Sequence, residues 1–471
     1  MLLEKSIREL AMLLRKKEIT IEELVGESIV RSNKQNNTLN CFISLRTEKE
    51  LLAEARKKDA ELTDDKPLLY GIPFSVKDSY VTQDLPTTSG SKILKDFISP
   101  YTATVVQKLL DAGAVLVGKN SQDSWGHGGS SENTDFAVVK NPWNTKHIAG
   151  GSSGGSAAAV TARLVAFSIG EDTGGSIRNP ASMCGVSGLK VTYGRVSRYG
   201  TIAYASSLDT VGPIAKTAED LAIVLQEIAG ADAKDGSSSQ RPVDDYTKNL
   251  QTNVARKKIG VPKQFFVKNY NQEVRSRVLE AIAEFEKLGL TTVELDMPVL
   301  DYAIPIYYML AASETSSNLA RYDGVRYGGT RDQFLPESAR RIMLGTYALS
   351  AGYAEELYKN AQRARTLLIQ SYQNAFEQCD VIAAPTTPNP AQKFGELLSN
   401  PMENMLADLF TVTANIVGIP SVAIPVGFSS SELPIGMQII GNKFDEAQIL
   451  NLAHLYQTAT TWHDQAPTKY Q

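Results

Sequence analysis

The feature that constrains the fold most is a helical pattern that leads into a short buried strand, between residues 104 and 118. Apolar side chains recur at helical spacing over residues 104–111, and residues 114–117 form an unbroken apolar run between Gly113 and Gly118. A helix that turns at glycine into an apolar strand is typical of α/β proteins. Residues 258–261 and 380–384 predict further strands, and residues 70–77 predict a turn that enters one. We therefore expect an α/β fold.

Two helices are predicted at the start of the chain, and others are predicted further along it. Ser6 with Glu9, and Thr20 with Glu23, match the capping-box pattern that begins a helix. Residues 273–288 predict an amphipathic helix, residues 353–378 a long helix and residues 234–242 a loop. Neither an internal repeat nor a clear seam divides the sequence. We expect residues 1–471 to form one domain, with its core motifs at about residues 70–215.

Charge and composition exclude several classes of function. The 471 residues carry a formal net charge of -4, without the strongly basic surface of a protein that binds nucleic acid by itself. Three widely spaced cysteines predict neither a disulfide framework nor a zinc knuckle. The four histidines are too scattered for a metal motif, so we expect no metal or organic cofactor in this chain. So few histidines also favour a different general base in any hydrolytic site.

The sequence carries no pattern of a secretory signal or a membrane span. Its N-terminus lacks a basic stretch followed by an apolar run, and no apolar run approaches the roughly 18 residues that cross a bilayer. We expect a soluble protein of a reducing compartment. The cytoplasm is the favoured location, with an organellar matrix as the alternative.

A glycine-rich segment, residues 150–156, surrounds two adjacent serines, Ser152 and Ser153. Glycines on both sides let the backbone take unusual geometry and leave side chains and amides open to a ligand. The segment is also compatible with a flexible surface turn. A phosphate-binding loop is disfavoured, because the Gly-Lys-Ser/Thr ending that reaches the phosphates is absent.

A second segment, residues 172–178, places Ser176 after two glycines. Successive backbone N–H groups in such a turn can converge on one point, as an oxyanion hole requires. A tight turn into a helix explains the same pattern equally well.

Lys77 follows the turn of residues 71–74 and apolar Val76. Burial disfavours the ammonium form, so a lysine in such surroundings can be neutral and act as a base near neutral pH. A solvated surface lysine is the alternative, and the more common one.

Taken together, Lys77 and the two glycine-rich segments resemble the defining motifs of the amidase-signature family. The resemblance implies a mixed β-sheet core covered by helices on both faces. It implies a triad in which Ser176 attacks an amide carbon to form an acyl-enzyme, Ser152 relays the proton after a cis peptide bond to Gly151, and neutral Lys77 takes that proton. It further implies that an oxyanion hole is formed by Ser176 itself and the backbone amides of Thr173, Gly174 and Gly175.

Within this family, residues 188–200, 205–213, 311–324 and 340–346 resemble the A subunits of tRNA-dependent amidotransferases. That resemblance implies hydrolysis of glutamine to supply ammonia for converting glutamyl-tRNA(Gln) to glutaminyl-tRNA(Gln). It implies a heterotrimer with B and C subunits, in which the partner holds ATP, magnesium and the charged tRNA.

The resemblance also implies three substrate-binding residues. Tyr307 lines the glutamine pocket, Arg341 binds the α-carboxylate and Asp408 binds the α-amino group. A bidentate guanidinium suits a carboxylate, and an aspartate suits an ammonium. The alternatives are a solvated helix face for Arg341, which adjoins Arg340, and a helix N-cap for Asp408.

Two departures from the pattern of these relatives leave other functions open. His127 stands where relatives have methionine, and the segment between Tyr327 and Arg340 is shorter than in many of them. These differences motivate a free-standing amidase acting on other small carboxamides as the alternative function. A non-catalytic glycine-rich nucleotide-binding or scaffold protein is a third interpretation.

Overall fold

A single mixed sheet runs through the protein. The computed structural model describes residues 1–251, 254–267, 270–325 and 329–470; Tyr327, at the start of the shortened segment, lies outside them. The described residues contain eleven strands in the order β1-β3-β2-β4-β6-β5-β10-β11-β9-β7-β8. The strands are β1 (Phe42–Leu45), β2 (Pro73–Lys77), β3 (Val115–Asn120), β4 (Phe167–Asp172), β5 (Ser187–Lys190), β6 (Thr210–Ala215), β7 (Lys258–Pro262), β8 (Thr291–Leu295), β9 (Val381–Pro385), β10 (Ser421–Phe428) and β11 (Pro434–Gly441).

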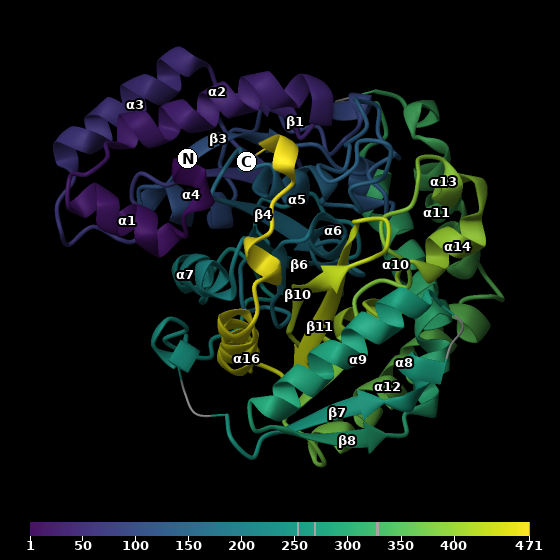
Figure 1. Cartoon of the computed structure of the whole chain (residues 1–471). Helices are drawn as coiled ribbons and strands as arrows, with labels where there is room; N and C mark the ends of the chain where they lie inside the picture. The colour runs from purple at the N-terminus through teal and green to yellow at the C-terminus, as the bar shows by residue number, and fades with distance from the viewer. Residues whose placement is uncertain (252–253, 268–269, 326–328, 471) are drawn as a thin grey trace.

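Helices cover both faces of this sheet (Figure 1). Every residue of β2, β4, β6 and β11 is buried, which requires cover on both sides. The helices α5 and α6 pack on one face, and α7, α9 and α16 pack on the other. The predicted α/β class is therefore confirmed.

The α-helices are α1 (Ile7–Arg15), α2 (Ile21–Leu39), α3 (Glu48–Glu61), α4 (Thr104–Asp111), α5 (Gly154–Thr161), α6 (Arg178–Cys184), α7 (Ala218–Ile228), α8 (Lys263–Val267), α9 (Gln272–Lys287), α10 (Ala303–Asn318), α11 (Pro336–Ala348), α12 (Asn360–Phe376), α13 (Glu396–Ser399), α14 (Pro401–Leu406), α15 (Val412–Val417) and α16 (Glu446–Ala459).

Local sequence signals position several of these elements correctly. Ser6 and Thr20 each form the predicted capping box, and they begin α1 and α2. The predicted strand at residues 114–117 is β3, which pairs in parallel with β2. The predicted helix at residues 273–288 is α9, and residues 234–242 form the expected loop.

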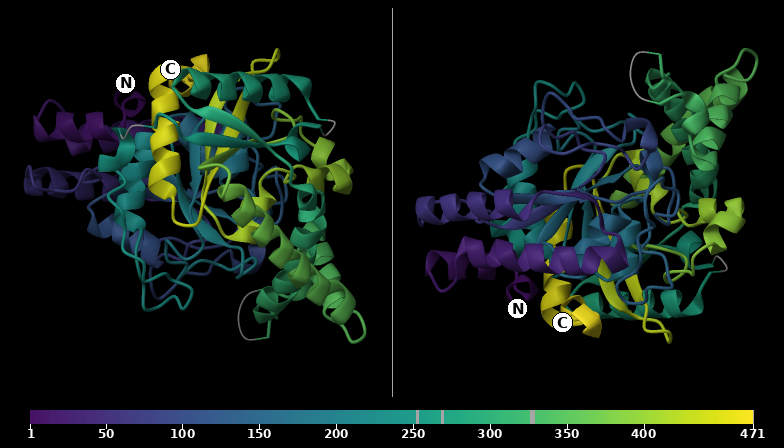
Figure 2. Two further views of the ribbon diagram at one scale, coloured as in Figure 1. Left: turned by 90° about the horizontal axis from the view of Figure 1, so that it is seen from below. Right: turned by 90° about the horizontal axis from the view of Figure 1, so that it is seen from above.

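The long helix expected over residues 353–378 is wrong at its start. A π-helical turn spans Glu355–Lys359, and the regular α-helix α12 begins only at Asn360. Within the turn the N–H of Lys359 donates to the carbonyl of Ala354, five residues earlier, so the backbone is wider than an α-helix. Together with α10 and α11, this region projects from the body of the molecule (Figure 2).

Among the described helices, none has both the length and the apolar character that crossing a bilayer demands.

Parallel strands β2 and β4 end next to each other, so the predicted functional residues lie together at the carboxyl ends of these two strands. Lys77 is the last residue of β2, and Asp172 is the last residue of β4. The turn after β4 carries Ser176 and leads into α6, while Ser152 lies just before α5. Segments far apart in the sequence therefore meet at the ends of these two strands.

Candidate active site

Lys77 and Ser152 are in direct contact at the carboxyl end of β2. The Nζ atom of Lys77 donates to Oγ of Ser152 over 2.7 Å. Each residue is only 1% exposed. Burial lowers the pKa of Lys77, although the nearby carboxylate of Glu171 works against that effect. A lysine with a lowered pKa and a serine hydroxyl as its hydrogen-bond partner can accept a proton.

The backbone around Ser152 has the unusual geometry predicted for it. The Gly151–Ser152 peptide bond is cis. A Cβ atom at Gly151 would lie 2.2 Å from Oδ2 of Asp123, so only glycine fits there. The carbonyl of Ser152 accepts from the N–H of Asp123 over 3.3 Å. Asp123 itself is buried, which raises the pKa of its carboxyl to about 7.

Ser176 lies beside this pair, in the turn between β4 and α6. Its carbonyl accepts from the N–H of Ser153 over 3.1 Å, which ties the two serine-bearing loops together. The Ser176 side chain is 9% exposed. Within the described residues no hydrogen bond joins the hydroxyls of Ser152 and Ser176. The structure thus brings the three predicted triad residues to one place and links only Lys77 with Ser152 directly.

The backbone amides of the turn divide into two groups. The N–H of Gly175 donates to Oδ1 of Asp172 over 2.8 Å, and the N–H of Ile177 donates to Oδ2 over 3.2 Å. The predicted use of the Gly175 amide in an oxyanion hole is therefore corrected, because its hydrogen is already bound. The N–H groups of Thr173, Gly174 and Ser176 have no protein partner in the described part of the chain. These three are available to an oxyanion.

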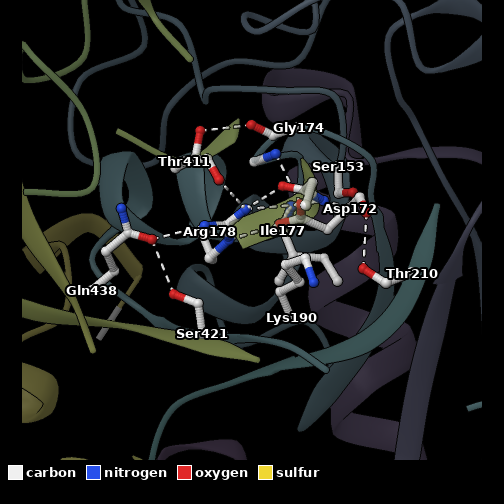
Figure 3. Close-up of polar contacts among 12 residues, drawn as sticks. Ser153, Asp172, Gly174, Ile177, Arg178, Lys190, Thr210, Thr411, Ser421 and Gln438 are labelled. Carbon is white, nitrogen blue, oxygen red and sulfur yellow. Dashed lines mark hydrogen bonds and ion pairs between the residues drawn. The ribbon is translucent and has the colours of Figure 1, made fainter. Parts of the chain in front are cut away.

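A buried ion pair holds the turn in shape (Figure 3). Two nitrogens of Arg178 each lie 3.1 Å from one oxygen of Asp172. Nη1 of Arg178 donates to Gln438 over 2.7 Å, and Nη2 lies 2.7 Å from Oδ1 of Asn415 and 3.0 Å from the carbonyl of Thr411. Burial alone would raise the pKa of Asp172, but Arg178 outweighs it and lowers the pKa to about 2. A fully bonded charge pair of this kind fixes local geometry.

The hydroxyl of Thr411 approaches the same turn from the other side. It donates to the carbonyl of Gly174 over 2.6 Å. A Cβ atom at Gly175 would lie 2.3 Å from this hydroxyl, and Gly175 has a φ of +138°. Both observations require glycine at this position.

Tyr307 adjoins the turn that carries Ser176. A Cβ atom at Gly174 would lie 2.5 Å from the Tyr307 hydroxyl, which shows how closely the ring approaches. The same hydroxyl donates to the hydroxyl of Tyr204 over 3.3 Å. Tyr307 is on α10 and is buried. The structure therefore places this predicted pocket residue directly against the turn.

Arg341 lies in the same cluster. It is 3% exposed, so the alternative of a solvated helix face is wrong. Its Nη1 atom hydrogen-bonds to the hydroxyl of Tyr204, its Nε atom lies 2.7 Å from Glu337, and its guanidinium lies 5.2 Å from the ring centre of Tyr308. Neighbouring Arg340, more exposed, pairs with the same Glu337.

Asp408 completes the cluster through Tyr308. The Tyr308 hydroxyl donates to Oδ2 of Asp408 over 3.2 Å. The helices α14 and α15 are capped by Asn400 and Thr411, so Asp408 is not the N-cap considered from the sequence. Burial raises the pKa of Asp408 to about 7, although Arg341 opposes the shift. Arg341 and Asp408 thus each contact a tyrosine hydroxyl in one polar cluster.

His127 links this polar cluster to helices α10 and α11. Its ring packs edge-on against Tyr204, with centroids 4.7 Å apart. Its nitrogens lie 3.0 Å from the hydroxyl of Ser338 on α11 and 3.3 Å from that of Thr315 on α10. Burial lowers the pKa of His127 well below its usual range. The histidine that stands where relatives have methionine is therefore a neutral, hydrogen-bonded side chain.

Several residues of the site were not predicted. Arg178 lies within a predicted motif but had no expected role, and Tyr204, Tyr308 and Glu171 had none either. Two consecutive acidic residues after an apolar block, Glu171 and Asp172, were the available signal for Glu171. Tyr204 gave none, because its contacts come from distant helices.

The fold and the residues gathered at this site are those of an amidase, and comparison with known proteins agrees. A family model described as Amidase matches residues 23–450. The chain belongs to this family, the amidase-signature family.

Three of its relatives within the family carry the same name. The A subunit of glutamyl-tRNA(Gln) amidotransferase from Coxiella burnetii (strain Dugway 5J108-111) is 48% identical, over 98% of this chain and 99% of the relative. The protein of the same name from Nitrosomonas eutropha (strain DSM 101675 / C91 / Nm57) is 46% identical over 99% of each chain. The crystal structure of the Thermotoga maritima protein of that name matches with a TM-score of 0.86 and 36% identity, over 99% of this chain and 98% of that chain. The resemblance recognised in the motifs is confirmed.

Proposed function

We propose that this chain hydrolyses the side-chain amide of glutamine and releases ammonia. The observation that carries the chemistry is the buried 2.7 Å contact between Lys77 and Ser152, next to the turn of Ser176. A lysine that burial makes less basic replaces the histidine of other serine hydrolases. The substrate is inferred from the two amidotransferase relatives, which align over nearly their whole length.

In the proposed acylation step, Oγ of Ser176 attacks the amide carbon. As the new C–O bond forms, the Ser176 proton passes to Oγ of Ser152, and the Ser152 proton passes to the lone pair of Lys77. When the C–N bond breaks, the ammonium proton of Lys77 returns through Ser152 to the departing nitrogen, which leaves as ammonia. Water then hydrolyses the acyl-enzyme by the same route and releases glutamate.

Negative charge on the amide oxygen is stabilised by the N–H groups of Thr173, Gly174 and Ser176. The buried Asp172–Arg178 pair holds this turn in place before the substrate arrives. Such preorganisation is what makes an oxyanion hole effective, because no donor has to be reoriented during the reaction.

The substrate's other end binds to the polar cluster of Arg341, Asp408 and the tyrosines. Arg341 donates to the α-carboxylate, Asp408 accepts from the α-ammonium, and Tyr307 lines the site of the substrate's side chain. In this structure Arg341 is hydrogen-bonded to the hydroxyl of Tyr204, and Asp408 is hydrogen-bonded to that of Tyr308. Glutamine therefore exchanges one set of polar contacts for another, and neither charge is left unpaired on binding.

We further propose that the chain works in a heterotrimer with B and C subunits in the cytoplasm, folded as one domain over residues 1–471. A partner holds ATP, magnesium and the charged tRNA. There the ammonia converts glutamyl-tRNA(Gln) to glutaminyl-tRNA(Gln). This division of labour fits the net charge of -4, because the tRNA is bound mainly by the partner.

The test is to purify the tagged chain gently from its own cells and to combine native mass spectrometry with an ammonia assay. We expect one larger and one small partner, and ammonia release from glutamine that Ser176→Ala abolishes. Retained activity in Ser176→Ala overturns the triad. Recovery as a lone monomer or homodimer overturns the heterotrimer.

The second candidate is a free-standing amidase for other small carboxamides. The His127–Tyr204 contact favours it, because it places a polar network behind the substrate pocket. Efficient hydrolysis of simple amides by the isolated chain, with little preference for glutamine, supports this alternative over the first.

A further inference from the structure

A buried carboxylate, that of Glu171, lies beside the amine of Lys77. One carboxylate oxygen of Glu171, Oε2, is 3.7 Å from Nζ of Lys77, and the Glu171 carbonyl is 3.5 Å from the same nitrogen. The two side chains are 3% and 1% exposed. In the described part of the chain Lys77 is the one cation within ion-pair distance of Glu171.

The backbone of Glu171 is fixed by the serine loop. Its N–H donates to Oγ of Ser153 over 3.3 Å, and Oγ of Ser153 is also 3.3 Å from its carbonyl. Ser153 directly follows Ser152, so the carboxylate, the lysine and the relay serine share one rigid support.

Among the charges around Lys77, that of Glu171 raises its pKa the most. Burial opposes the ammonium form and is the largest cause of the lowered Lys77 pKa; Glu171 is the strongest opposing charge, followed by Asp123, Asp209 and Asp172. Burial also raises the pKa of Glu171, while Lys77, the hydroxyl of Ser79 and the guanidinium of Arg198 oppose that shift. The two groups therefore stabilise each other's charged form.

We propose that Glu171 is the counter-ion of Lys77, a positioning residue that holds the amine against Ser152 and stabilises the ammonium formed as Ser176 attacks. The proposal rests on the function proposed above. It assigns to Glu171 the role that a buried aspartate has behind a catalytic histidine, where it orients the base and stabilises its protonated form.

This role has a specific consequence for the dependence on pH. Without the carboxylate, the ammonium form of Lys77 loses its strongest stabilising charge, and the pKa of Lys77 falls further. The neutral, active lysine then persists to lower pH, so the acidic limb of the kcat/KM profile moves to lower pH. The base is also weaker, so the plateau rate falls.

The experiment compares Glu171→Gln with the wild type, each in the complex with its partners. Glutaminase rates are measured across pH, and folding is checked by thermal unfolding. We expect kcat to fall about 10- to 100-fold, which is less than the loss of the general base itself because Lys77 is still present, and the acidic limb to shift to lower pH. Glu171→Asp, which keeps the charge, should restore the limb toward its wild-type position.

A matched control is Asp220→Asn. Asp220 is also a buried carboxylate, but it accepts from the N–H of Ile7 and is not among the main charges that act on Lys77. This variant should leave the acidic limb unchanged, so that a shift in Glu171→Gln cannot come from loss of any buried charge.

A second readout separates this proposal from the proposed function. Labelling of Ser176 by a fluorophosphonate reports the activated serine without any amide substrate, and its rate is followed across pH in both proteins. If the wild type is labelled but does not hydrolyse glutamine, the proposed substrate is wrong and the role of Glu171 is still tested. An acidic limb that stays at the same pH in Glu171→Gln, in labelling and in turnover, overturns the role of Glu171. Absence of labelling in the wild type overturns both.

Discussion

Nζ of Lys77 and Oγ of Ser152 lie 2.7 Å apart although 75 residues separate them in the chain. The contact forms where strand β2 ends against the loop before α5. Both partners are almost completely buried, so water does not compete for this hydrogen bond. A lysine held in this way has one obvious proton partner, and that partner is a serine.

Replacing Lys77 by methionine removes the amine and keeps most of the side-chain volume. We expect kcat for glutamine to fall about 100- to 10,000-fold, which is the usual contribution of a general base. The variant also leaves Glu171 without its cation. The double variant Lys77→Met/Glu171→Gln removes that unpaired charge, and it should remain as inactive as the single one. Recovery of activity in the double variant would contradict a role for Lys77 as the base.

Arg341→Lys tests the proposed carboxylate site. Lysine keeps the charge but loses the planar, bidentate donor geometry. We expect kcat/KM for glutamine to fall about 10- to 100-fold, the value of one to two charge-assisted hydrogen bonds, mainly through a higher KM. Steady-state kinetics with glutamine measures it.

The control for Arg341 is its neighbour, Arg340→Lys. Both arginines pair with Glu337, but only Arg341 contacts the tyrosine pocket. The control should leave KM close to the wild-type value. Equal effects of the two substitutions would show that Arg341 acts through helix α11 and not through the substrate.

His127 predicts a pH dependence of stability. Its pKa in the folded protein lies well below the usual 6.5, because burial disfavours the charged form. Above 6.5 the ring is neutral in both the folded and the unfolded state, so its contribution to stability is complete. As the pH falls below 6.5, the unfolded state takes up a proton that the folded state does not, and stability is lost.

The measurement is the free energy of unfolding in urea between pH 7.5 and 5. His127→Met should reduce the slope by up to about 1.4 kcal/mol per pH unit, the value of one proton. The slope is compared, and not the absolute stability, because the substitution also removes the contacts with Ser338 and Thr315. His147→Gln is the control, since His147 is partly exposed and should change the slope less. An unchanged slope in His127→Met would show that the ring is protonated in the folded state.

Signals that are local in the sequence predicted the fold well. The capping boxes of Ser6 and Thr20 and the apolar run of β3 depend on residues a few positions apart, so their physics is visible in the sequence. The strand order was not predictable, because β5 pairs with β10 across more than two hundred residues. The start of α12 was missed because the helical periodicity continues through the π-helical turn.

The site divides in the same way. Lys77, Ser152 and Ser176 could be predicted because each lies in a short motif. Glu171 and Tyr204 could not, because each gains its role from a partner that only folding brings near. Four amides of the Ser176 turn were expected to form the oxyanion hole, but only three are free within the described residues, since Asp172 accepts from the N–H of Gly175.

The buried pair of Asp172 and Arg178 gives the sharpest prediction for stability. Both side chains are completely buried, and Arg178 bonds to four different residues. Arg178→Met leaves the Asp172 carboxylate without its cation. We expect a loss of about 3–5 kcal/mol in the free energy of unfolding, the usual cost of breaking a buried pair. Urea unfolding followed by tryptophan fluorescence measures it.

The matched control is Arg56→Met. Arg56 pairs with Glu22 at 2.8 Å, a shorter contact than that of Arg178, but the Arg56 side chain is 63% exposed. Water replaces such a surface contact at little cost, so the midpoint of urea unfolding should stay at its wild-type value. Burial, not distance, therefore decides which arginine matters. If Arg178→Met unfolded at the same urea concentration as Arg56→Met, the Asp172–Arg178 pair would not be what stabilises the fold around the Ser176 turn.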